Sequence, residues 1–335
     1  MRTIVVFGSQ PYDEHFFNLM NTEKNFGFSF KFLKENLTEE TAILAKGDEI
    51  VCVFVNDTVN AKVIDTLYKN GTRLLALRCA GFNNVDLKAA EGKIQVVRVP
   101  AYSPYAVAEY ALGLMLASNR HICLARQRTR EGNFSLNGLI GFDMHEKTIG
   151  VIGTGKIAKV LIELLSGFHV HILAYDIYPD ENFAQKFGVK YTTPDEIFKH
   201  SDIITLHCPL TPESRHIINA DAIAKMKPGV MLINTGRGPL IDTSALIDGL
   251  KKRVIGAAAL DVYEKESDYF YTDHSTEVME DDNLARLLSF NNVIVSSHQA
   301  FFTREALTNI ATTTLENVKA YLEHKPLANE VKVGM

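Results

Sequence analysis

The sequence predicts an α/β protein built from two doubly wound parallel sheets, and three observations support this fold class. The chain has 335 residues, which suggests two domains at roughly 150 residues per domain. Short apolar runs alternate with helical stretches along the chain, which is typical of parallel sheets covered by helices. A glycine-rich turn at residues 153–158 opens a second such series.

Composition narrows the class of protein further. Apolar residues make up 46% of the chain, and 35 Lys and Arg stand against 40 Asp and Glu, for a net charge of −5. This balance excludes a basic surface for nucleic acid or an anionic membrane. The four cysteines are widely scattered, which indicates free thiols in a reducing compartment and neither disulfides nor a zinc site. We therefore expect a cytoplasmic protein with no transmembrane helix.

The first series of elements occupies roughly the first hundred residues. Buried strands are predicted at 3–7, 50–55, 73–78 and 95–99, with a helix at 59–70. A long helix is then expected to begin at Ser103-Pro104 and to run to Ile122, because serine caps helices and proline suits their first turn.

The second series contains six predicted strands, the number in a complete dinucleotide-binding fold. They lie at 148–152, 170–175, 202–207, 230–234, 254–260 and 293–297. A final helix is predicted at 303–321. Nine of the 22 residues from 261 to 282 are Asp or Glu, which is typical of a solvated loop.

The turn Gly153-Thr154-Gly155-Lys156-Ile157-Ala158 follows a predicted strand and opens a predicted helix. Gly153 permits the tight turn, Gly155 lets the backbone approach a pyrophosphate, and Ala158 still allows close packing of helix on strand. The phosphates would lie at the helix N-terminus, where free N–H groups favour anions.

Asp176 ends the next predicted strand, 23 residues after Gly153. A carboxylate at this place accepts hydrogen bonds from the ribose hydroxyls and repels a 2′-phosphate. The sequence therefore predicts NAD, in preference to NADP, as the cofactor.

Three polar residues follow later predicted strands, at the edge where open α/β sheets bind ligands. They are Arg237, Glu266 and His298. Reduction of a 2-keto acid needs a fixed cation for the carboxylate, an acid to protonate the developing alkoxide, and a group that favours the charged form of that acid. Arginine, histidine and glutamate supply these three functions.

Stretches spread over the chain resemble the D-isomer-specific 2-hydroxyacid dehydrogenase family, and within it the branch that forms D-lactate. They keep the family's order and lie at 77–86, 99–104, 107–109, 153–158, 206–212, 235–238, 261–264 and 298–301. Gly236 and Ala158 depart from the family's more frequent serine and glycine.

The resemblance implies a role for each matching position. Arg237 matches the substrate-binding arginine, His298 the proton donor, and Glu266 its carboxylate partner. The implied substrate contacts are Phe54, Ala80, Gly81, Tyr102 and Phe301. The implied contacts with NAD are Gly153, Gly155, Lys156, Ile157, Asp176, Cys208, Pro209, Ser214, Thr235, Gly236 and Asp261.

The resemblance also implies a domain organisation and an activity. A flavodoxin-like substrate domain would comprise residues 1–102 and 299–335, and a Rossmann NAD-binding domain residues 103–298, in a homodimer or homotetramer. The implied reaction is the reduction of pyruvate to D-lactate by NADH. Two alternatives stay open: a dehydrogenase for a bulkier 2-keto acid, and a dinucleotide-sensing binding protein of the same fold.

Overall fold

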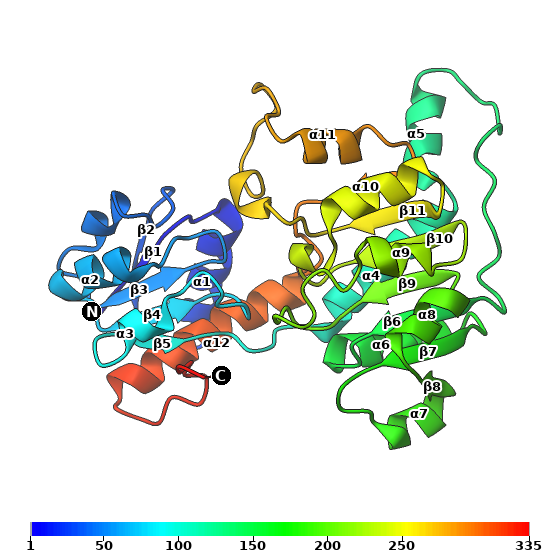
Figure 1. Ribbon diagram of the computed structural model, residues 1–335. Coiled ribbons are helices and arrows are strands. Elements are labelled where there is room, and N and C mark those ends of the chain that lie inside the picture. The colour runs from blue at the N-terminus through cyan, green and yellow to red at the C-terminus, as the bar shows by residue number, and fades with distance from the viewer. Residues whose placement is uncertain (1, 335) are drawn as a thin grey trace. The chain divides into compact units, whose positions relative to one another are not determined.

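The computed structural model describes residues 2–334, which form two compact units (Figure 1). Unit 1 contains the described residues up to Ser103 and those from Phe302 onward, and unit 2 contains Pro104–Phe301. Each unit has one parallel sheet with helices on both faces, which confirms the predicted fold class.

The unit 1 sheet has five parallel strands in the order β2-β1-β3-β4-β5, the flavodoxin-like order. Every residue of β3 and β4 is buried, as expected for strands that are covered on both faces. The strands are β1 (Thr3–Val6), β2 (Ser29–Phe32), β3 (Ile50–Val53), β4 (Leu74–Leu77) and β5 (Gln95–Val97).

Two hydrophobic clusters cover the two faces of this sheet. One contains α1 (Pro11–Glu23) and α12 (Arg304–Leu322). The other contains η1 (Thr41–Ala45), α2 (Ala61–Lys69) and α3 (Leu87–Ala90). The C-terminal helix predicted at 303–321 is confirmed as α12, and the Thr303 hydroxyl caps it by accepting from the Ala306 nitrogen.

The unit 2 sheet has seven parallel strands in the order β12-β11-β10-β9-β6-β7-β8, which is the dinucleotide-binding order extended by one strand. The order reverses between β6 and β9, and ligands bind at such a reversal. The strands are β6 (Thr148–Ile152), β7 (His171–Tyr175), β8 (Val189–Tyr191), β9 (Ile203–Leu206), β10 (Val230–Asn234), β11 (Ile255–Leu260) and β12 (Val293–Val295).

Helices again form two layers around the unit 2 sheet. α4 (Pro104–Asn119), α6 (Lys156–Ser166) and α7 (Glu181–Phe187) belong to one cluster. The other cluster contains α8 (Pro194–His200), α9 (Ala220–Ala224), α10 (Thr243–Lys251) and α11 (Asp282–Leu288). Within residues 2–334, no helix combines the length and the apolar character that crossing a membrane requires.

The structure corrects three sequence-based expectations. β2 and β8 were not predicted, because both are short edge strands with exposed residues and lack a continuous apolar run. The helix predicted from 103 to 122 ends at Asn119, as α4, and a second helix, α5 (Ile122–Arg130), begins three residues later. They are separated at His121, whose φ of 49° is left-handed and ends the α-helical backbone.

Candidate active site and cofactor site

The turn between β6 and α6 has the shape that a dinucleotide requires. Gly153 has a φ of 90°, and a Cβ there would lie 2.5 Å from the Cys208 nitrogen, so no other residue fits. This contact joins the ends of β6 and β9 at the point where the strand order reverses. A Cβ at Gly155 would meet no atom within 4 Å, so the space above the helix start is open.

The N-terminus of α6 keeps its backbone donors available. Its N-cap is Gly155, which has no side chain to accept from the first-turn N–H groups. In α7 through α11 a side chain performs that function, as Asp180 does at the start of α7. Free N–H groups at a helix start bind phosphate, so α6 fits a pyrophosphate. Lys156 and Ile157 form the first turn and are both accessible.

Asp176 lies at the end of β7, where the sequence predicts contact with the ribose. Its Oδ2 accepts from the backbone nitrogen and the hydroxyl of Thr154, and its Oδ1 accepts from the Tyr178 nitrogen at 2.9 Å. Partial burial acts to raise the pKa of Asp176, but these hydrogen bonds outweigh it and the pKa is lowered. The carboxylate is therefore charged at neutral pH, as repulsion of a 2′-phosphate requires.

Other predicted cofactor residues lie at the ends of β9 and β10. Cys208 and Pro209 follow β9, and the Ser214 hydroxyl donates to the Pro209 carbonyl at 2.7 Å. Thr235 is 8% exposed, and its buried hydroxyl has no hydrogen-bond partner within residues 2–334. An orphaned hydroxyl at the carboxyl end of a strand fits a site that a ligand completes.

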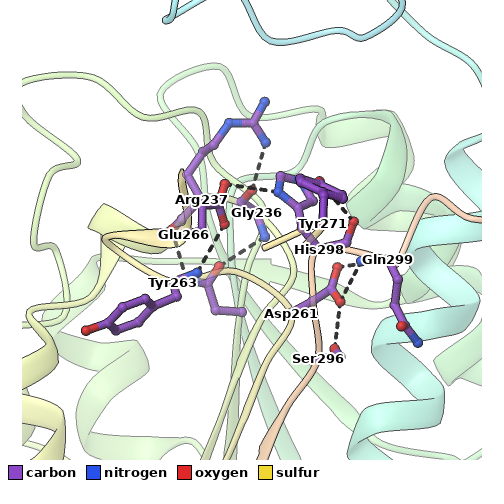
Figure 2. Close-up of polar contacts among 11 residues, drawn as sticks. Gly236, Arg237, Asp261, Tyr263, Glu266, Tyr271, Ser296, His298 and Gln299 are labelled. Atoms are coloured by element: carbon purple, nitrogen blue, oxygen red, sulfur yellow. Dashed lines mark hydrogen bonds and ion pairs between the residues drawn. The ribbon is translucent and has the colours of Figure 1, made fainter. Parts of the chain in front are cut away.

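The predicted catalytic residues come from three neighbouring strands. Arg237 follows β10, Glu266 follows β11 and His298 follows β12, and these strands are adjacent in the sheet. Figure 2 shows the three side chains gathered at this edge. Parallel strands bring their carboxyl ends together, so residues 61 positions apart in the sequence meet here.

Glu266 and His298 form a direct pair. The His298 Nδ1 lies 3.0 Å from Glu266 Oε1, and the two side chains are 15% and 23% exposed. The Tyr263 nitrogen donates to Glu266 Oε2 at 3.2 Å, which fixes the carboxylate. Because Nδ1 faces the carboxylate, the other ring nitrogen, Nε2, is available to a ligand.

Arg237 is half-buried and has most of its donors available. Its Nη1 donates to the Gly236 carbonyl at 2.8 Å, and it forms no ion pair in the described part of the chain. The following Gly238 packs so closely that a Cβ would lie 2.0 Å from the Tyr263 carbonyl oxygen. This close approach ties the arginine turn to the loop that carries Glu266.

Sequence reasoning missed how the loop at His298 is supported. Asp261 is fully buried, and its carboxylate accepts from the Ser296 hydroxyl at 2.6 Å and the nitrogens of Gln299 and Ala300 at 2.9 and 2.8 Å. The Asp261 carbonyl also accepts from the His298 nitrogen at 2.7 Å. These bonds hold His298 at a left-handed φ of 53°. Burial raises the pKa of Asp261.

Sequence reasoning also missed Tyr271, in the acidic segment. Its hydroxyl donates to the His298 carbonyl at 3.3 Å, and its ring centre lies 6.1 Å from that of His298 (Figure 2). The acidic composition of 261–282 indicated only a solvated loop, so no sequence signal identified this contact.

Glu264 and Glu266 have different partners although they are two residues apart. Glu264 accepts from the Thr243 nitrogen and hydroxyl at 2.9 and 2.6 Å, and it lies 2.7 Å from His216 Nε2. It thereby attaches the loop to the start of α10. Only Glu266 of the two contacts His298.

The predicted substrate residues lie in both units. Phe54, Ala80, Gly81 and Tyr102 follow β3, β4 and β5 in unit 1, and Phe301 belongs to unit 2, where it is 7% exposed. The Ala80 carbonyl accepts from Arg98 at 2.8 Å and the Tyr102 carbonyl from Asn309 at 2.6 Å, so these loops are anchored. Their contact with substrate stays a prediction.

A dinucleotide fold that carries an imidazole–carboxylate pair and an arginine at its ligand-binding edge is the architecture of an NAD-dependent oxidoreductase. Residues 112–300 match the family described as D-isomer specific 2-hydroxyacid dehydrogenase, NAD binding domain. The chain belongs to this family, and NAD is its cofactor.

Relatives match over almost the whole chain. A 2-hydroxyacid dehydrogenase homolog of Haemophilus influenzae is 53% identical, over 94% of this chain and 95% of its own. The D-lactate dehydrogenase of Escherichia coli is 49% identical, over 98% of this chain and 99% of its own. The solved structure of a pyruvate reductase of Chlamydomonas reinhardtii superimposes with a TM-score of 0.92 at 44% identity, covering 98% of each chain.

Proposed function

We propose that this enzyme reduces pyruvate to D-lactate with NADH. The observation that carries the proposal is the His298–Glu266 pair at 3.0 Å on the strand edge that also presents Arg237. The names of two similar proteins, a D-lactate dehydrogenase and a pyruvate reductase, support this choice of substrate.

Arg237 binds the anionic end of the substrate in this proposal. Its guanidinium is planar and has donors available for two parallel hydrogen bonds to a carboxylate. The same cation also stabilises negative charge that develops on the keto oxygen. The close packing of Gly238 holds the turn that carries Arg237, so the arginine backbone has a fixed position at the edge of the sheet.

His298 donates a proton to the keto oxygen. Glu266 faces Nδ1, so it fixes the orientation of the ring and directs Nε2 away from the carboxylate. NADH, when bound, supplies the hydride that adds to the keto carbon. Proton and hydride together convert the ketone into the hydroxy acid, and His298 is left neutral.

A homodimer is the assembly that we propose, with a second copy of the chain bound through unit 2. Four apolar side chains of the segment 122–140 are 53–88% exposed, namely Ile122, Phe134, Leu136 and Ile140. Several exposed apolar side chains within one segment are typical of an interface. Light scattering should give twice the chain mass, and Phe134→Ser with Leu136→Ser should halve it. A wild-type monomer would contradict this.

The proposed location is the cytoplasm. All four cysteines are free thiols, and Cys123 is exposed, which suits a reducing compartment. Fractionation of the source cells with an antibody against the chain tests this location, and recovery in an oxidising compartment would contradict it.

The activity is tested by following NADH oxidation with pyruvate and determining the chirality of the lactate formed. Rapid formation of D-lactate supports the proposal. If pyruvate is inert and a branched or aromatic 2-keto acid is reduced, the site chemistry stands and the substrate is a bulkier acid. Inactivity with every 2-keto acid, with retained NADH binding, would favour a dinucleotide-sensing protein and overturn the proposal.

A further inference from the structure

A chain of hydrogen bonds runs from Asp176 to the start of α7. The Thr154 hydroxyl donates to Asp176 at 3.0 Å, the Tyr191 hydroxyl donates to Thr154 at 3.0 Å, and the Asp180 nitrogen donates to Tyr191 at 3.2 Å. Tyr191 lies on β8, the edge strand beside β7. The predicted ribose-binding carboxylate is therefore linked to the backbone of Asp180, whose side chain is a second carboxylate.

Asp180 forms an ion pair with Lys159, whose side chain comes from the first turns of α6. The Lys159 nitrogen donates to the Gly155 carbonyl, so this lysine is one helical turn from the glycine fingerprint. Its ammonium also lies 5.3 Å from the centre of the Phe183 ring. Lys159 and Asp180 are 35% and 38% exposed, so a bound ligand can sense both charges.

The charges of Asp176, Asp180 and Lys159 determine the electrostatic potential at the end of β7, where the ribose is expected to bind. Asp176 and Asp180 are negative and Lys159 is positive, so the group has a net charge of −1. Consecutive hydrogen bonds hold these residues in one group, and charges interact without strong screening over about 8 Å at physiological salt. Without Asp180, an unpaired ammonium would offset Asp176.

We infer that Asp180 determines cofactor specificity by neutralising Lys159, so that the Asp176 charge repels a 2′-phosphate without opposition. The cluster would otherwise contain a lysine able to bind that phosphate, because cations beside the ribose stabilise NADP. The inference concerns the discrimination between NAD and NADP and does not depend on which keto acid is reduced.

Asp180→Asn tests the inference with little structural change. The Asp180 Oδ1 caps α7 by accepting from the Phe183 nitrogen at 3.0 Å, and asparagine caps equally well. Binding of NADH and of NADPH is measured by nicotinamide fluorescence without any keto acid, so failure of the proposed substrate would not affect the result. We expect affinity for NADPH relative to NADH to rise about fivefold, with the gain decreasing at high salt.

A matched control exists in the same unit. Lys225 and Asp195 form another accessible ion pair, with both carboxylate oxygens within 2.9 Å of the ammonium. Asp195 lies on α8 and is not linked to Asp176, so Asp195→Asn should leave the NADPH to NADH ratio unchanged. If both variants change the ratio equally, overall charge is responsible and the inference is wrong.

A double variant separates the charge of Lys159 from a structural role of the pair. Adding Lys159→Gln to Asp180→Asn should abolish the gain in NADPH affinity. Retention of the gain in the double variant, or an unchanged ratio in an Asp180→Asn protein with the wild-type melting temperature, would overturn the inference.

Discussion

At the carboxyl edge of the unit 1 sheet an arginine is buried among carboxylates, whereas at the same edge of the unit 2 sheet an arginine is half-exposed and forms no ion pair within the described residues. Arg78 follows β4 and is 3% exposed, with its Nε 3.3 Å from Asp13. Arg237 follows β10, and within residues 2–334 its guanidinium bonds only the neighbouring Gly236 carbonyl.

The buried charges of unit 1 hold loops in place. Arg78 donates to the Gly8 carbonyl at 3.0 Å and lies 5.1 Å from the centre of the Phe54 ring. Asp57, 2% exposed, accepts from the nitrogens of Leu37 and Phe54 at 2.6 Å each. Burial raises the pKa of Asp57, although Arg78 opposes the increase.

The accessible charges of unit 2 are those to which the proposed function assigns the chemistry. His298 and Glu266 satisfy each other and leave one imidazole nitrogen available, and Arg237 keeps donors available for a carboxylate. The comparison teaches that burial and the number of internal partners distinguish a structural arginine from one that binds a ligand. The position of an arginine directly after a strand does not distinguish these two functions, because Arg78 and Arg237 both follow a strand.

The largest effect is expected from His298→Gln, which removes the proposed proton donor of unit 2. Turnover of pyruvate should fall about thousandfold, the scale of a lost general acid, while NADH affinity and the urea midpoint stay the same. Steady-state kinetics measure the turnover, fluorescence titration the NADH affinity, and urea unfolding the midpoint. Loss of NADH binding would instead assign His298 a structural role.

Arg78→Met breaks the buried cluster of unit 1. The free energy of unfolding should fall by about 4 kcal/mol, because Asp13 and Asp57 are left buried without their cation. Urea unfolding monitored by circular dichroism gives this value. The comparison fails if stability is unchanged, since Arg78 would then not be structural.

His207, next to the cofactor loop, should make stability depend on pH. Burial lowers its pKa to about 4, and its Nε2 lies 2.8 Å from the Thr205 hydroxyl. The unfolded chain takes up the proton near pH 6.5, so stability is present above that pH and is lost as the pH falls. Relative to His207→Asn, the wild type should lose about 3 kcal/mol between pH 7 and pH 4. If the free energy of unfolding of the two proteins changes equally with pH, the prediction is wrong.

Arg237→Lys tests the accessible arginine of unit 2. We expect kcat/KM for pyruvate to fall about hundredfold with unchanged stability, because an ammonium cannot form two parallel bonds to a carboxylate. Kinetics near those of the wild type would exclude a bidentate contact. A large loss of stability would remove the contrast with Arg78.

Glu266→Gln gives the smallest expected effect, a moderate loss of turnover. Without the carboxylate, the His298 ring loses the charged partner of Nδ1 and Nε2 is less firmly oriented, so kcat for pyruvate should fall about tenfold with unchanged NADH affinity. Glu264→Gln is the matched control, because Glu264 contacts Thr243 and His216 instead. An equal loss of turnover in both variants would contradict the pairing.

Some strands and some site residues can be predicted from the sequence, whereas others cannot. Buried strands such as β3 and β4 are continuous apolar runs and were predicted, whereas the edge strands β2 and β8 are partly exposed and were not. Arg237, Glu266 and His298 stand in motifs whose residue types suit the chemistry. Tyr271 stands in no motif, so only its contact with His298 identifies it.

The sequence alone determined the parallel α/β class, the dinucleotide turn at Gly153 and the three polar residues at strand ends, because these depend on local periodicity and on the residue types that the chemistry needs. The tertiary structure decided contacts that the sequence did not indicate: Asp261 with residues 296–300, Tyr271 with His298, and Asp180 with Lys159. Such contacts depend on strand order and on which charges become buried. Both are set by packing between residues far apart in the chain, which no local pattern records.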